Sequence, residues 1–113
     1  MLKKMPDWYW TKGLHDAEIT EYRVSGLFYD MRDPHPIRNY LELTIDSKQA
    51  MFDTSIKKIK LYNHKILSAL KNPKNLWWKE DTLSEENGKY ILTIKGHNHE
   101  EFIVRFDSAE VIR

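Results

Sequence analysis

The chain contains no cysteine. Disulfide frameworks, zinc sites built on thiolates and a cysteine nucleophile are therefore excluded. Only four glycines occur in 113 residues, and no two are adjacent, so the chain has no glycine-rich loop for phosphate binding. No segment approaches the roughly 18 consecutive apolar residues that a membrane-spanning helix requires.

The first seven residues carry two lysines but no apolar run follows them, so they do not have the pattern of a signal peptide. We therefore expect a cytoplasmic protein without a membrane partner. A chain of this length, with 31% charged and 41% apolar residues, is typical of one globular domain spanning 1–113. Its oligomeric state stays open.

Positive charge is concentrated in the middle of the chain. The net charge is only +1, yet residues 54–79 contain seven lysines and no acidic residue. This 57–79 lysine block is one candidate for nucleic-acid binding through phosphate contacts. It contains no arginine, the residue that grips phosphate in two places, and a run of lysines also suits a solvated face.

The chemically richest stretch is 8–19, which holds three aromatic residues, Gly13 and the pair His15-Asp16. One interpretation is a turn before a strand, in which Asp16 accepts backbone N–H groups and His15 packs near the N-terminal tryptophans. The other is a site pair in which Asp16 orients the imidazole. An enzyme of that kind needs a concave pocket around the pair. We predict the turn, and we assign no catalytic residue and no cofactor.

Aromatic residues are dense for a small domain. Exposed Trp and Tyr are enriched at binding surfaces, and adjacent residues of a strand point to opposite faces. These side chains also suit a role in covering an open end of a sheet. With the His-Asp pair they form our predicted binding surface: Trp8, Tyr9, Trp10, His15, Asp16, Trp77 and Trp78.

Two further histidines, His97 and His99, stand close to Glu101. Such residues on one face could bind a divalent ion. A polar hairpin tip explains them as well, so we assign no metal ligand.

Several strands are indicated by local pattern. Residues 40–46 alternate, with Leu41, Leu43 and Ile45 on the buried side. Residues 19–28 suggest a bulged strand, and the prolines of 30–37 predict a loop. Segment 56–63 fits a strand, although a helical stripe through the same region ending at Asn72-Pro73 is the alternative. Residues 109–112 suggest a final strand.

Asn87-Gly88 predicts a two-residue hairpin, because a type I′ turn needs positive φ at both central positions. If the register is counted outward from this turn, Leu83 pairs with Leu92 and Glu80 pairs with Lys95. A second turn at 96–100 then pairs Lys95 with Glu101. Both registers match apolar with apolar residues and charge with opposite charge. The other pairs are Glu86 with Lys89, Thr82 with Thr93, Ile94 with Phe102, Leu92 with Val104 and Tyr90 with Phe106.

Together these patterns predict an α+β domain that is mainly β, an antiparallel meander of five to seven strands. We expect it to form a curved sheet or open barrel with at most one short helix. The predicted core is Leu41, Leu43, Ile45, Leu92, Ile94, Val104 and Phe106.

Trp8 and segments 13–17, 38–42, 52–54, 61–63 and 77–78 resemble small uncharacterised bacterial proteins with an N-terminal Leu-His-Asp-Ala element. More distantly they resemble the immunity-protein-like families of bacterial toxin systems. The resemblance implies a β-rich fold and a bacterial source, and it carries over no active site. The leading hypothesis is therefore a non-enzymatic protein-interaction module, with an immunity-like role as one form.

Overall fold

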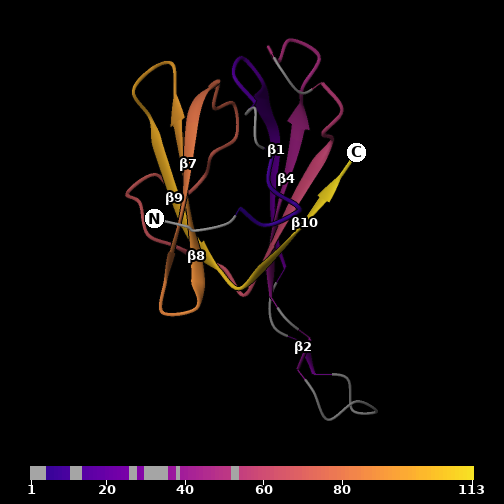
Figure 1. Cartoon of the computed structure of the whole chain (residues 1–113), viewed down its shortest axis with the longest axis vertical. Helices are drawn as coiled ribbons and strands as arrows, with labels where there is room; N and C mark the ends of the chain where they lie inside the picture. Colours follow the sequence, from indigo (N-terminus) through magenta and orange to yellow (C-terminus); the bar gives the residue numbers. More distant parts are fainter. Residues whose placement is uncertain (1–4, 11–13, 26–27, 30–35, 38, 52–53) are drawn as a thin grey trace.

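The computed structural model describes residues 5–10, 14–25, 28–29, 36–37, 39–51 and 54–113. Two four-stranded antiparallel sheets face each other, and a two-stranded ribbon extends beyond one of them (Figure 1). The described part of the chain contains no helix, so the prediction of a mainly β fold is confirmed. The prediction of one curved sheet or open barrel is wrong, because the chain crosses between two separate sheets after β5 and after β9.

The first sheet has the strand order β1-β4-β5-β10, and the second has the order β6-β9-β8-β7. The described residues form ten strands where five to seven were predicted, because three of them are only two residues long and show no alternation. Their bounds are β1 Glu18–Ser25, β2 Phe28–Tyr29, β3 Pro36–Ile37, β4 Tyr40–Asp46, β5 Lys58–Tyr62, β6 Lys65–Ile66, β7 Trp78–Glu86, β8 Lys89–Gly96, β9 Glu101–Phe106 and β10 Ser108–Ile112.

The hairpin predictions are confirmed pair by pair. Leu83 lies opposite Leu92, and Glu80 opposite Lys95. Asn87 and Gly88 have φ of 53° and 78°, as a type I′ turn requires. Across the next turn, Lys95 lies opposite Glu101. The remaining predicted pairs are Glu86 with Lys89, Thr82 with Thr93, Ile94 with Phe102, Leu92 with Val104 and Tyr90 with Phe106.

The strand at 40–46 is confirmed as β4, with its three aliphatic side chains buried. The predicted bulge lies in β1, where the register shifts between Ile19 and Glu21. Of the predicted loop 30–37, residues 30–35 lie outside the described residues. Pro36 and Ile37 form β3, so this end of the prediction is wrong. A two-stranded ribbon has only edge strands, and an edge tolerates proline.

The ambiguous segment after residue 56 is a strand, β5, followed by the short β6 and irregular chain. Ile59 and Leu61 are fully buried between the sheets. On the outer face, Glu42 of β4 lies 3.4 Å from the Lys58 Nζ and 3.9 Å from the Lys60 Nζ. The helical alternative is wrong because pairing with β4 and β10 on both sides satisfies the backbone of β5.

The core between the sheets contains every predicted core residue. It also contains an aromatic group around Asp81 of β7. The carboxylate of Asp81 accepts hydrogen bonds from the Trp10 and Trp78 indoles, each at 2.9 Å, and from the Tyr9 hydroxyl. Burial raises the pKa of the Asp81 carboxyl, and these three hydrogen bonds oppose that rise. A register shift between Trp78 and Glu80 turns both Trp78 and Asp81 toward the core.

The Tyr9 hydroxyl gives the fold a pH dependence. Its burial and its proximity to the Asp81 carboxylate raise the pKa of Tyr9 above the ordinary value. The folded chain therefore holds this proton more tightly than the unfolded chain, and the resulting stability is complete below pH about 10. We expect the free energy of unfolding to fall as the pH rises above that value. Urea titrations across pH 8–11 should show a shallower fall in Tyr9→Phe than in the wild type, and equal slopes would contradict the assignment.

Candidate functional site

The segment before β1 ties the two sheets together. The backbone N–H of Asp16 donates to the Trp78 carbonyl at 2.8 Å, and the Trp78 N–H donates to the Ala17 carbonyl at 2.8 Å. A single bridge between Glu18 and Trp77 continues this contact. The side chains of His15 and Asp16 are thus held at the junction of β1 and β7.

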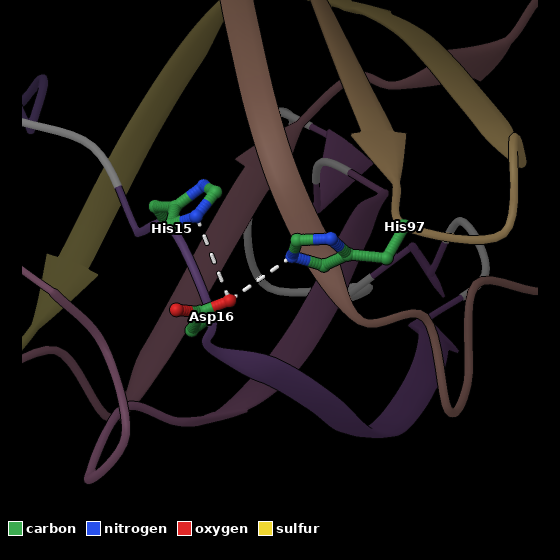
Figure 2. A group of neighbouring side chains, drawn as sticks. All are labelled: His15, Asp16 and His97. Atoms are coloured by element: carbon green, nitrogen blue, oxygen red, sulfur yellow. Dashed lines mark hydrogen bonds and ion pairs between the residues drawn. The ribbon is translucent and has the colours of Figure 1, made fainter.

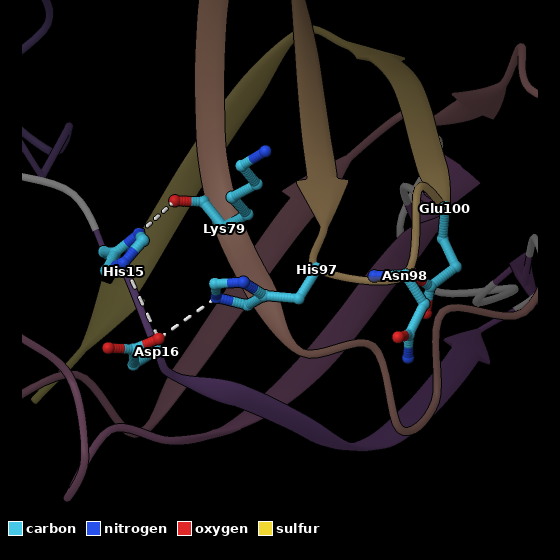
Figure 3. A network of polar contacts seen from close by, with 6 residues as sticks. All are labelled: His15, Asp16, Lys79, His97, Asn98 and Glu100. Atoms are coloured by element: carbon cyan, nitrogen blue, oxygen red, sulfur yellow. Dashed lines mark hydrogen bonds and ion pairs between the residues drawn. The ribbon is translucent and has the colours of Figure 1, made fainter.

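The turn between β8 and β9 brings a third side chain to the same place. The His97 N–H donates to the Trp77 carbonyl at 2.9 Å, and the Gly96 N–H donates to the Glu100 carbonyl at 2.9 Å. The Glu100 carboxylate also accepts the Asn98 N–H at 2.9 Å on the same turn (Figure 3). These bonds fix the turn so that the His97 ring points toward residues 15 and 16.

Two imidazoles converge on one carboxylate oxygen (Figure 2). The Asp16 Oδ1 lies 3.0 Å from the His97 Nε2 and 3.6 Å from the His15 Nε2. The two rings meet edge to face, with centroids 5.2 Å apart. The side chains are half-buried, with exposed fractions of 35% for His15, 32% for Asp16 and 24% for His97. Asp16 adopts a positive φ of 73°, which aspartate tolerates better than most residues.

The opposite nitrogen of the His15 ring has its own partner. His15 Nδ1 lies 2.6 Å from the backbone carbonyl of Lys79 (Figure 3). A carbonyl oxygen only accepts hydrogen bonds, so Nδ1 must carry the proton. In the neutral ring, the lone pair is therefore on Nε2, the nitrogen that faces Asp16.

A cavity of about 530 Å³ opens beside this cluster. Its lining combines carboxylates, amides and an indole: Asp16, Glu18, Asp46, Gln49, Asn75, Trp77 and Asn98. Trp77 is 48% exposed and packs against the His97 ring in a tilted arrangement, with centroids 4.2 Å apart. The arrangement joins an accessible aromatic face to a group of negative charges.

The predicted binding surface is only partly at the surface. Trp10 and Trp78 are fully buried, so their assignment to a binding surface is wrong. They lie in the core because their indoles pack edge to face and share the Asp81 carboxylate. Trp8 and Tyr9 are half-buried, and Trp8 packs on Tyr90 and Phe106, which pair where β8 begins and β9 ends. The alternative role, in which these aromatics cover the sheet, therefore fits the N-terminal residues, while Trp77 remains accessible.

Sequence reasoning missed the grouping of His97 with His15 and Asp16. It placed His97 with His99 and Glu101, which are both exposed in the structure. The predicted pairing of Glu80 with Lys95 already brings the 96–100 turn beside the start of β7. The missing information was that residues 16–19 also pair with residues 76–78, at the start of β7. No local sequence pattern indicates this contact. The predicted packing of His15 near the N-terminal tryptophans is likewise replaced by the contact of its ring with His97.

The lysine block does not form one unpaired stripe. Lys58 and Lys60 share Glu42, and the Lys74 Nζ lies 3.7 Å from a Glu21 carboxylate oxygen. Surface pairs of this kind stabilise the fold little, yet they lower the positive field that attracts nucleic acid.

Replacing Asp16 tests its structural role. Asp16→Ala should lower the free energy of unfolding by about 1–2 kcal/mol, since alanine resists positive φ and cannot accept from His97. Asp16→Asn should cost less, because asparagine tolerates this backbone conformation and keeps an acceptor oxygen. Urea unfolding measures both. Glu85→Ala, which removes an exposed acidic side chain further along β7, is the control, and unchanged stability in Asp16→Ala would contradict the prediction.

Comparison of the chain with models of protein families, with curated proteins and with solved structures finds no match in any of the three. The resemblance to immunity-protein-like families therefore stays a prediction. The described residues contain no helix with the length and apolar character needed to cross a membrane.

Proposed function

We propose that this chain is a non-enzymatic protein-interaction module that receives a basic side chain of its partner in the cavity beside Trp77. An immunity-like role, as the sequence resemblance implies, is one form of this function. The proposal rests on Glu18 and Asp46, two carboxylates of the cavity lining for which the described residues provide no lysine or arginine partner.

Glu18 and Asp46 carry the argument. They lie directly opposite each other in the pairing of β1 with β4, and both are exposed. Like charges at such positions destabilise a sheet. Neither carboxylate has a lysine or arginine partner within the described ranges. A cationic group from a partner would relieve this repulsion, and the exposed face of Trp77 would add a cation–π contact.

An enzyme using His15 and Asp16 is the second candidate, because the cavity adjoins Asp16 as that hypothesis requires. We favour binding because the described lining residues offer carboxylates, amides and an indole. They include no hydroxyl, thiol or lysine that would serve as a nucleophile. Trp77 has the exposure and position of an interface anchor.

The test is a selection from a library of random peptides with the purified chain in EDTA. Arginine or lysine should be enriched in the binders. Trp77→Ala and Glu18→Gln should each weaken the best peptide at least about tenfold, as loss of an interface anchor or a paired charge does. Leu67→Ala removes an apolar side chain that is 43% exposed, and Glu85→Gln removes a charge further along β7, so both are controls that should leave binding unchanged. Binders without basic residues, or binding that ignores Trp77, would overturn the proposal.

A further inference from the structure

Three potential metal ligands lie together at the junction of the two sheets. Each of His15, Asp16 and His97 offers one ligand atom, and the three atoms all lie within 4.8 Å of one another. Figure 2 shows both rings directed at the carboxylate from different segments of the chain. The set contains two imidazoles and one carboxylate, which suits divalent transition metals rather than Mg²⁺ or Ca²⁺.

The hydrogen bond of His15 to Lys79 prepares the ring for this role. Ligating histidines usually donate their other N–H to a carbonyl or carboxylate, which fixes the tautomer and leaves the ligating nitrogen unprotonated. Here Nδ1 donates to the Lys79 carbonyl at 2.6 Å. In the neutral ring, the Nε2 lone pair then faces the Asp16 Oδ1 at 3.6 Å, so two acceptors confront each other. A cation between them resolves this conflict.

The distances also suit a single ion. Zinc binds imidazole nitrogen and carboxylate oxygen at about 2.0–2.1 Å, which places tetrahedral ligand atoms about 3.3 Å apart. The separations of 3.0 Å and 3.6 Å from Asp16 to the two imidazoles bracket that value. The two histidine ligand atoms lie within 4.8 Å of each other, so side-chain rotations would have to shorten that distance by at most about 1.5 Å.

The backbone holds the ligands in place before any ion binds. The N–H groups of Asp16 and His97 donate to consecutive carbonyls of Trp78 and Trp77, and the Met51 N–H donates to the His15 carbonyl at 2.8 Å. Metal affinity gains from such preorganisation because little ordering is needed on binding. Three protein ligands also leave one tetrahedral position for water or for a donor atom of another molecule.

We propose that His15, Asp16 and His97 bind one divalent transition-metal ion, with zinc as the probe. This site goes beyond the proposed interaction function and does not depend on it. Because peptide binding is tested in EDTA, without metal, either proposal can fail while the other holds.

The experiment is calorimetric titration of the tag-free chain with ZnCl₂ in the presence of excess Mg²⁺. One zinc should bind per chain with a Kd in the micromolar range or below. His15→Gln, Asp16→Asn and His97→Gln should each weaken binding at least about tenfold, and zinc should raise the Tm of the wild type more than that of the variants. His99→Gln is the matched control, because it removes an exposed histidine from the same turn as His97.

Binding weaker than about 1 mM, or an equal loss in His99→Gln and His97→Gln, would overturn the site. If a variant does not fold, NMR of the wild type decides. Saturation with zinc should then shift the imidazole signals of His15 and His97 and leave those of His99 in place, and the reverse pattern would refute the proposal.

Discussion

Asp81→Ala should lower the free energy of unfolding by about 3–5 kcal/mol. The Asp81 carboxylate accepts three hydrogen bonds, two of them from the indoles of Trp10 and Trp78, which are 2% and 0% exposed. Removing the acceptor leaves these N–H groups buried without a partner, and each such group costs about 1–3 kcal/mol. The Tyr9 hydroxyl is only half-buried, so water can replace part of its bond.

Asp81→Asn separates charge from hydrogen bonding. Its amide oxygen can still accept a hydrogen bond, but its NH₂ group would face one of the three donors. We therefore expect its free energy of unfolding to lie between that of Asp81→Ala and that of the wild type. Glu80→Ala is the matched control on the adjacent, exposed position. Its ion pair with Lys95 is 3.9 Å long and solvated, so its loss should change stability by no more than about 0.5 kcal/mol. Urea unfolding measures all three variants, and a loss below about 1 kcal/mol in Asp81→Ala would show that the aromatic group does not depend on this carboxylate.

Leu43→Ala is expected to cost about 2–5 kcal/mol, the range for removing a fully buried leucine. Leu43 is 0% exposed and lies on β4, between Tyr22 of β1 and Ile59 of β5. A central strand with partners on both sides has little freedom to close the resulting cavity. The cost should therefore fall in the upper half of the range.

Val24→Ala provides the comparison for Leu43. Val24 belongs to the neighbouring strand β1 but is 46% exposed, so its truncation removes little buried surface. We expect its free energy of unfolding, measured in urea, to stay within about 0.5 kcal/mol of the wild-type value. Similar losses of stability in Leu43→Ala and Val24→Ala would mean that the Leu43 side chain does not point into the core.

The local strand pattern of this protein could be predicted from the sequence alone. The β7–β8 and β8–β9 pairings follow from Asn87-Gly88, from the 96–100 turn and from matched residues a few positions away. The facing of β4 follows from its alternation. In each case the interacting residues lie close in sequence, so the turn fixes the register before any distant contact is made.

The division into two sheets was decided by the tertiary structure. β10 pairs with β5 in the first sheet, although the strand before it, β9, belongs to the second. The alternation of β9 is the same whichever sheet it joins, and β10 has no clear alternation. The burial of the two inner faces against each other decides which sheet each strand joins, and that burial depends on the whole chain.

At the candidate site, too, the sequence determined one part of the arrangement and the tertiary structure another. Gly13 lies outside the described residues. His15 and Asp16 do lie in a turn, with the Ala17 N–H donating to the Leu14 carbonyl at 2.8 Å, but the hydrogen bond of the Asp16 carboxylate is with the His97 ring and not with the backbone N–H groups that were predicted. The partner of Asp16 is His97, 81 positions along the chain. Trp10 and Trp78 are buried for a similar reason, since each needs the distant Asp81 to satisfy its indole N–H. Local sequence determined which side chains stand at each turn. The pairing of residues 16–19 with residues 76–78 decided which of those side chains meet. Sequence alone could not show this, because that contact is stabilised by burial and backbone hydrogen bonds between segments about 60 residues apart.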